Sequence, residues 1–150
     1  MMNLDIGELF DTDQNGYIIN SEETILVTGA NGFVGSRVVH TLLSYGFKCV
    51  RCLTRPTSNS KNLEAIIKEF DRKKVEIVKG NLLSPDDCAI ATKGISIIYH
   101  LAAGVEKSFP GCFLNSVVTT RSLLDAVIKE QTLKRFVNIS SIAVYSNEKI

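Results

Sequence analysis

The feature that most constrains the fold of this chain is a glycine-rich turn between an apolar segment and an amphipathic segment. In ILVTGANGFVGSRVV, Gly29, Gly32 and Gly35 are spaced three residues apart. The first glycine allows a tight turn after a strand, the second lets the backbone approach a pyrophosphate, and the third lets a helix pack closely on the strand. The N–H groups of Phe33 and Val34 then lie at the positive end of a helix dipole, which favours an anion. The spacing indicates dinucleotide binding, and the alternative is a glycine-rich turn without a ligand.

Short apolar segments rich in β-branched residues alternate with segments of helical periodicity after residue 23. Strands are predicted at residues 24–29, 49–54, 75–80, 96–102 and 135–140. Helices are predicted at residues 33–45, 61–70 and 113–130, and another begins at Pro85 with Ser84 as its cap. Such alternation is typical of a parallel sheet with helices on both faces. The sequence therefore predicts a Rossmann-type, doubly wound α/β fold with strand order 3-2-1-4-5 over residues 24–150.

The first predicted helix shows which of its sides faces the sheet. Val34, Val38, Leu42 and Tyr45 fall on one stripe at helical spacing. Gly46 follows the stripe and is expected to end the helix, because glycine adopts the left-handed conformation found after many helices.

Composition excludes several classes of protein. The 150 residues carry 17 basic and 16 acidic side chains, a net charge of +1, which is too small for a surface that binds a nucleic acid backbone. No segment has about 20 consecutive apolar residues, so no membrane span is predicted. The first residues are acidic where a secretion signal would be basic. We therefore expect a globular protein of the cytoplasm.

The Cys49-x-x-Cys52 pair has a spacing that can mark zinc or redox chemistry. Both cysteines fall in a predicted strand, where side chains three residues apart point to opposite faces. The two sulfur atoms are therefore not expected to share a metal ion, and we interpret them as reduced structural thiols. No metal site is predicted.

The residues that follow the second predicted strand bear on the choice of cofactor. In a Rossmann unit an acidic residue there bonds the ribose 2′-hydroxyl of NAD and would repel the 2′-phosphate of NADP. This chain has Thr54 and Arg55 instead, and Lys61 follows six residues later. The Arg55 guanidinium can form two parallel hydrogen bonds to a phosphate. NADP is therefore the predicted cofactor, with NAD as the alternative if Arg55 is only a solvated charge.

The chain resembles the extended short-chain dehydrogenase/reductase superfamily. Its fingerprint T-G-x-x-G-F-[IV]-G is matched from Thr28 to Gly35. GNLLSPDD is similar to the G-D-L-x-D-P stretch of that superfamily, YHLAA to H-x-A-A, and VNISSIAVYS to x-S-S-x-x-V-Y-G. Within it, the chain looks most like NAD-dependent epimerases/dehydratases and dihydroflavonol reductases. The matches span residues 24–146.

The resemblance implies further cofactor contacts. Asn81 stands where the superfamily has an acidic residue that bonds the adenine amino group, and an amide oxygen can accept the same hydrogen bond. Leu82 would pack against the adenine ring. Leu101, Ala102 and Ala103 match the stretch that passes beneath the cofactor. The preceding histidine on the same strand is interpreted as a packed imidazole.

The resemblance also implies one catalytic residue. Ser141 stands where related enzymes have a serine or threonine that hydrogen-bonds the substrate while a tyrosine passes the proton; the alternative is a hydroxyl that caps a turn. Tyr145 and Lys149 match Y-x-x-x-K by spacing alone. In related enzymes that pair lies on a helix well downstream of the serine, so we interpret this match as accidental.

The implied function is the NAD(P)-binding portion of an oxidoreductase or epimerase/dehydratase that acts on a carbonyl or sugar-nucleotide substrate. On this interpretation the Rossmann domain is incomplete, truncated after the fifth strand, and inactive without the substrate lobe that carries the tyrosine and lysine. The alternative is a non-enzymatic dinucleotide-binding or redox-sensing module. Such a sheet would expose Val137, Ile139 and the apolar side of residues 113–130, which predicts self-association.

Residues 1–23 form a predicted amino-terminal extension with an unexpected pattern. DTDQNGYIINSE matches a calcium loop with ligands at Asp11, Asp13, Asn15, Tyr17 and Glu22. The first strand begins at residue 24, however, which leaves no room for the helix that should follow such a loop. A flexible tail or a hairpin turning at residues 15 and 16 is the alternative.

Overall fold

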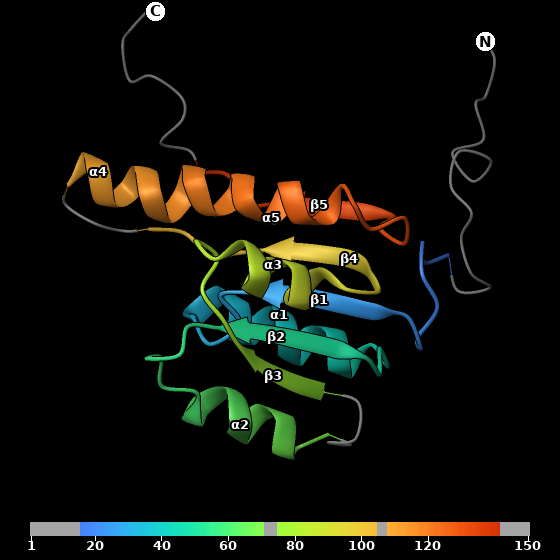
Figure 1. Ribbon diagram of the computed structural model, residues 1–150. Helices are drawn as coiled ribbons and strands as arrows, with labels where there is room; N and C mark the ends of the chain where they lie inside the picture. The colour runs from blue at the N-terminus through green and yellow to red at the C-terminus, as the bar shows by residue number, and fades with distance from the viewer. Residues whose placement is uncertain (1–15, 71–74, 105–107, 142–150) are drawn as a thin grey trace, which may run out of the picture.

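Five parallel strands form one sheet in the order β3-β2-β1-β4-β5 (Figure 1). The computed structural model describes residues 16–70, 75–104 and 108–141. The strands are β1 (Thr24–Thr28), β2 (Val50–Thr54), β3 (Val75–Lys79), β4 (Ile95–His100) and β5 (Arg135–Asn138). This order confirms the predicted doubly wound topology. Most strands end one or two residues before their predicted ends, because the chain there turns into the loops at the carboxyl edge of the sheet.

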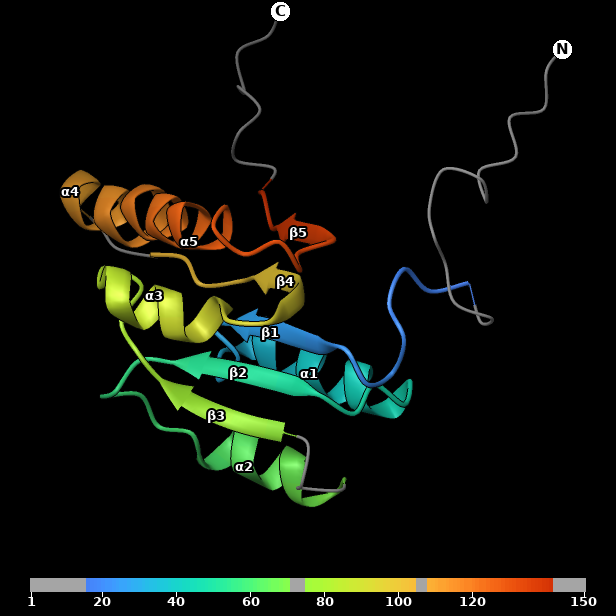
Figure 2. The ribbon, with the colours of Figure 1, turned by 45° about the vertical axis from the view of Figure 1, so that its right-hand side comes forward.

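Helices cover both faces of the sheet (Figure 2). One face carries α1 (Phe33–Ser44) and α2 (Lys61–Lys68). The other carries α3 (Pro85–Thr92) and a continuous helical stretch of α4 (Phe109–Cys112), the π-helical η3 (Phe113–Val118) and α5 (Thr119–Val127). This stretch begins four residues earlier than predicted, because the Ser108 hydroxyl accepts a hydrogen bond from the Gly111 N–H. In the described ranges, no helix has the length and apolar character needed to cross a bilayer.

The core consists of two apolar layers separated by the sheet. Ile25 and Val27 on β1 pack toward α1 and α2, whereas Leu26 between them packs toward α3 and α5. All three side chains are almost completely buried. This alternation follows from the two-residue period of a strand. The central strand is therefore covered on both faces, as a parallel sheet requires.

The buried side of α1 differs from the prediction. Val34 and Tyr45 were placed on the buried stripe, but they are 55% and 66% exposed. The buried positions are Gly35, Ser36, Val39, Leu42 and Leu43. The prediction was confirmed for Leu42, which is buried, and for Val38, which packs against the core, and it was wrong for the two end residues. The close approach of Gly35 to the preceding turn turns the start of the helix so that Gly35, and not Val34, faces the sheet. Gly46 has a φ of +86° and follows the last turn, as predicted.

Residues 16–23 pack against the sheet at the end where its strands begin, which we call the amino edge. Ile19 is buried in the apolar core between the sheet and α1, and the ring of Tyr17 lies 5.3 Å from that of Phe47. Glu23 forms an ion pair of 3.0 Å with Lys134. The predicted calcium ligands Asp11, Asp13 and Asn15 lie outside the described residues. The carboxylate of Glu22, the last residue of that pattern, forms an ion pair with Lys48.

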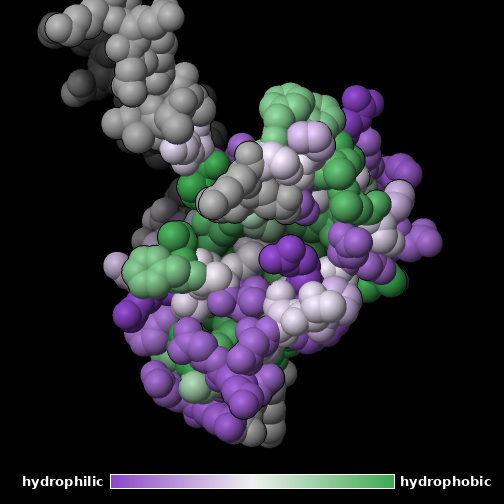
Figure 3. Space-filling view, turned by 90° about the vertical axis from the view of Figure 1, so that its left-hand side faces the viewer, coloured by the Kyte–Doolittle hydropathy of each residue, from purple (hydrophilic) through white to green (hydrophobic). Residues whose placement is uncertain are grey.

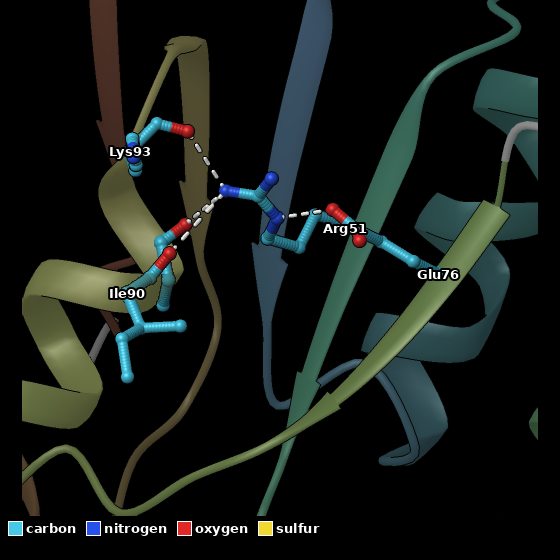
Figure 4. A network of polar contacts seen from close by, with 5 residues as sticks. Arg51, Glu76, Ile90 and Lys93 are labelled. Atoms are coloured by element: carbon cyan, nitrogen blue, oxygen red, sulfur yellow. Dashed lines mark hydrogen bonds and ion pairs between the residues drawn. The ribbon is translucent and has the colours of Figure 1, made fainter.

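Arg51 on β2 joins two strands and a helix (Figure 4). Its Nε donates to the carboxylate of Glu76 on β3. Its Nη1 donates to the carbonyl oxygens at the end of α3, Ala91 at 3.0 Å, Lys93 at 2.9 Å and Ile90 at 3.5 Å. These carbonyls lack partners within the helix and lie at the negative end of its dipole. The guanidinium therefore caps α3 and fixes it against the sheet.

We expect Arg51→Met to lower the free energy of unfolding by about 2 kcal/mol, because the carbonyls lose a charged donor that is mostly shielded from water. Glu76→Gln should cost only about 0.5 kcal/mol, since the Glu76 side chain is 53% exposed and leaves the helix cap intact. Denaturant unfolding of both variants gives the comparison. Equal losses would show that the ion pair, and not the cap, is the stabilising contact.

Candidate functional site

A cleft of about 420 Å³ opens at the carboxyl edge of the sheet. It lies between the ends of β1 and β4. The chain leaves β1 toward α1 on one face of the sheet and leaves β4 toward α4 on the other, and doubly wound sheets bind ligands at this position. The lining residues are Gly29, Asn31, Gly32, Arg55, Ser58, Leu82, Leu101, Ala102, Ala103, Gly104, Asn115 and Thr119. Figure 3 views this edge and shows apolar surface gathered over α4 at the top and polar surface near α2 below. This face of the molecule therefore has an apolar region on the side of α4 and a polar region on the side of α2.

The glycine turn forms one wall of this cleft. Gly29 has a φ of +65°, and a Cβ atom there would lie 2.9 Å from the backbone nitrogen of Ala102. A Cβ atom on Gly35 would lie 2.1 Å from the Gly29 carbonyl oxygen. Gly32 is the N-cap of α1 and supplies no side-chain cap. The first N–H groups of α1 therefore have no capping side chain, which suits them to bind an anion.

The structure brings together seven of the predicted site residues. Lining the cleft are Gly29, Gly32, Arg55, Leu82, Leu101, Ala102 and Ala103. Thr28 and Gly35 are buried and do not line it. Phe33 and Val34 begin α1 with exposed side chains, so only their backbone N–H groups remain candidates for an anion contact. Asn81 is exposed, and its side-chain oxygen accepts a hydrogen bond of 3.0 Å from the Leu83 N–H.

Five lining residues were not predicted: Asn31, Ser58, Gly104, Asn115 and Thr119. Asn115 and Thr119 are four residues apart and therefore share one side of a helix. The loop after β4 packs tightly here, since a Cβ atom on Gly104 would lie 2.6 Å from the Cβ atom of Asn115. The helical spacing of the two polar residues was the signal in the sequence that could have identified them.

A chain of buried and partly buried hydrogen bonds supports the floor of the cleft. The hydroxyl of Thr28 on β1 accepts the N–H groups of Leu101 and Ala102, both at 3.2 Å. The same hydroxyl lies 2.8 Å from Nδ1 of His100 on β4. Nε2 of His100 lies 2.9 Å from the hydroxyl of Thr120 on α5. One side chain thus connects the two central strands to the helix above them.

These contacts fix the tautomer of His100. The Thr120 hydroxyl donates to the Ser116 carbonyl, so it accepts from Nε2–H of the imidazole. The Thr28 hydroxyl already accepts two N–H groups, so it donates to Nδ1. His100 is 3% exposed, and burial lowers its pKa from 6.5 to about 4. The imidazole is therefore neutral at pH 7, and a second ring proton would oppose the Thr28 hydrogen bond.

The end of β2 presents little to the cleft except Arg55. The Thr54 side chain is 2% exposed, and among the described residues its hydroxyl has no hydrogen-bond partner. Cys52 on the same strand is buried, and burial raises the pKa of its thiol to about 12. Cys49 precedes the strand, is half-buried and forms no disulfide. Cys52 is therefore a protonated structural thiol, and neither cysteine lines the cleft.

The predicted catalytic residue lies apart from the residues that line the cleft. Ser141 follows the end of β5 by three residues and is exposed. It does not belong to the lining of the described cleft. Tyr145 and Lys149 lie outside the described residues. The catalytic role of Ser141 therefore stays a prediction.

Residues 25–150 match the model described as the NAD dependent epimerase/dehydratase family. An uncharacterised UDP-glucose epimerase of Bacillus subtilis is 31% identical over 134 residues, which cover 83% of this chain and 42% of the relative. Dihydroflavonol 4-reductase of Arabidopsis thaliana is 28% identical over 140 residues, 88% of this chain and 36% of that enzyme.

Among solved structures, UDP-glucuronic acid 4-epimerase from Bacillus cereus, in complex with UDP-glucuronic acid and NAD, is similar with a TM-score of 0.67 and 29% identity. The similarity covers 84% of this chain and 42% of the epimerase. The chain therefore spans about two fifths of the length of the relatives it matches.

We expect the free energy of unfolding to fall between pH 6.5 and about 4 because of His100. In this window the unfolded state binds the proton and the folded state does not, so stability is complete above the window and decreases with acid, by about 3 kcal/mol in all. Denaturant unfolding at several pH values measures the slope. His100→Gln should flatten it. An unchanged slope in His100→Gln would contradict this assignment.

Proposed function

The chain belongs to the NAD dependent epimerase/dehydratase family, and from this premise we propose that it forms the dinucleotide-binding part of an oxidoreductase or epimerase/dehydratase. Membership confirms the predicted superfamily resemblance. The observation that carries the proposal is the glycine turn, which leaves uncapped N–H groups of α1 beside the cleft. We propose a carbonyl compound or a sugar nucleotide as the substrate, since the relatives named above are epimerases and a reductase.

The residues of the cleft fit a dinucleotide. Gly32 carries no Cβ atom at the start of α1, so the backbone there can approach a pyrophosphate, and the Cβ atom that Gly29 lacks would collide with the Ala102 backbone. Arg55 and Leu82 would hold the adenosine end, by charge and by apolar contact. The bound nicotinamide would supply hydride transfer, and the chain would bind and orient it.

The cofactor preference is proposed from charge. No acidic side chain is present among the described residues that line the cleft, and Arg55 is the cation there. The buried Thr54 side chain offers no carboxylate to a ribose hydroxyl. A 2′-phosphate would therefore meet an attractive charge without a repulsive one. We propose NADP as the preferred cofactor, with NAD as the alternative.

We expect the chain to bind NADP(H) more tightly than NAD(H), and Arg55→Ala to remove most of that difference. Loss of a charge-assisted phosphate contact should weaken NADP by about 1.5 to 3 kcal/mol and leave NAD nearly unchanged. Calorimetric titration with each cofactor measures both affinities. Lys129→Ala, which removes one positive charge near the amino edge, should change neither. Equal affinities in the unmutated chain would contradict the NADP preference.

The chemistry of the proposed enzyme needs a proton donor beside the cofactor. Ser141 is the candidate for holding a substrate oxygen, and Tyr145 is not proposed as the donor because it lies only four residues beyond it. We therefore propose that the 150-residue chain binds the cofactor without turnover.

We expect no oxidation or reduction of the cofactor by the isolated chain in a spectrophotometric screen of carbonyl and sugar-nucleotide substrates. The reason is that Tyr145 and Lys149 match Y-x-x-x-K by spacing alone and follow Ser141 too closely in the sequence to be the catalytic pair. Turnover that Tyr145→Phe or Lys149→Ala abolishes would contradict this proposal and assign the YSNEK segment to catalysis.

Self-association and a cytoplasmic location stay predictions. Apolar side chains are exposed along the α4–α5 stretch, at Phe109, Phe113, Val117 and Ile128, and Ile139 after β5 is 54% exposed. Val137 is half-buried beside residues 17–19, so it contributes less than predicted. Such surface favours association with another apolar surface.

A further inference from the structure

We propose that Lys79 helps to determine specificity for the 2′-phosphate. It orders the loop that carries Arg55 through hydrogen bonds, and it adds a positive charge next to that loop. The inference rests on the proposed NADP preference. It concerns a residue of β3, whereas the cofactor contacts proposed above come from the glycine turn, the loops after β3 and β4, and Arg55 after β2. Lys79 does not line the cleft. It acts through the loop of residues 55–60, and it is therefore a positioning residue.

Lys79 is the last residue of β3 and pairs with Thr54, the last residue of β2. Its side chain therefore lies beside the point at which the chain leaves β2 toward Arg55. Nζ of Lys79 donates to the Ser60 hydroxyl at 2.7 Å and to the Ser58 carbonyl at 3.3 Å. The lysine thus bridges the edge strand and both ends of the short segment 58–60.

The partners of this ammonium group are neutral oxygen atoms. Among the described residues, no carboxylate lies within ion-pair distance of Lys79. The Ser60 contact is partly buried, whereas Lys79 as a whole and its Ser58 contact are exposed. The ammonium group beside the loop therefore has no counter-charge among the described residues, and a dianionic phosphate bound near the loop would be attracted to it.

The hydroxyl of Ser60 binds Lys79 and does not cap the helix that follows it. Ser60 is the N-cap of α2, yet its hydroxyl makes no capping hydrogen bond. The Asn59 side chain accepts the Lys61 N–H at 2.9 Å instead. The Asn59 carbonyl accepts a weaker hydrogen bond of 3.4 Å from Asn31 in the glycine turn. The loop is therefore attached to β3 by Lys79 and to the glycine turn by Asn31.

These attachments act on the two loop residues that line the cleft, Arg55 and Ser58. The Ser58 N–H donates to the Arg55 carbonyl at 3.0 Å, so both belong to one turn. A loop that is already ordered loses less conformational freedom when a ligand binds. The 2′-phosphate of NADP would gain from this order and from the charge, whereas the neutral 2′-hydroxyl of NAD would gain little from either.

A purely structural role for Lys79 predicts a different result. Loosening of the sheet edge would lower the melting temperature and weaken both cofactors alike. A specificity role changes the ratio of the two affinities. The ratio is therefore the informative measurement, and the melting temperature of each variant shows whether the fold has been retained.

The test compares Lys79→Met with Lys79→Arg, which keeps a cation, and with Lys129→Met as a matched loss of charge near the amino edge. Affinities are measured for NADP and NAD, and for 2′,5′-ADP and 5′-AMP, which isolate the 2′-phosphate. We expect Lys79→Met to weaken NADP and 2′,5′-ADP about tenfold and to leave NAD and 5′-AMP within about twofold. Lys79→Arg should restore most of the difference, and Lys129→Met should change nothing.

Ser60→Ala provides a second variant, because it removes the hydroxyl partner and keeps the charge. It should weaken NADP less than Lys79→Met does, again without an effect on NAD. An NADP preference that persists in Lys79→Met, or an equal loss for both cofactors, would overturn the role of Lys79 alone. Equal affinities in the unmutated chain would overturn the NADP preference itself, and the role of Lys79 with it.

Discussion

The carbonyl oxygen of Gly29 lies against the first turn of α1, where even a methyl group on Gly35 would come within 2.1 Å of it. This contact determines how closely the helix approaches the end of β1 and which of its sides faces the sheet. It also directs the first N–H groups of α1 toward the carboxyl edge. On the other side of the same turn, Gly29 lies against the backbone of Ala102. The cleft thus depends on two backbone contacts that only glycine permits.

A second set of contacts holds the floor of the cleft in place. The loop after β4 would be free to move away from β1 if only its strand hydrogen bonds retained it. The Thr28 hydroxyl binds two of its N–H groups, and His100 connects that hydroxyl to α5. Because the imidazole is buried and neutral, this support carries no charge that could disturb an anionic ligand. His100 therefore holds the loop after β4 in place without adding a charge near the cleft.

The sequence predicts the strand order and the glycine turn well, because both follow from local patterns: alternating apolar segments and a fixed glycine spacing. The buried stripe of α1 was predicted correctly at Val38 and Leu42 and wrongly at Val34, since a contact between Gly35 and Gly29 determines which residue of the first turn faces the sheet. Ser58 and Lys79 could not be assigned to the cleft region from the sequence. One lies in the loop after β2 and the other ends β3, and only the parallel register of the strands and the course of the loop bring them near each other.

Residues 16–23 are attached at the edge of the sheet opposite the cleft, through Ile19 in the core and Glu23 on Lys134 (Figure 1). This part of the chain therefore lies at the amino ends of the strands, across the sheet from the glycine turn (Figure 1). A fluorescent label, an affinity handle or an immobilising surface attached at residue 16 would sit at that end of the sheet and not at the cleft. The same anchorage means that deletion up to residue 23 would remove a core side chain, so a shortened version for biophysical work should begin before Gly16.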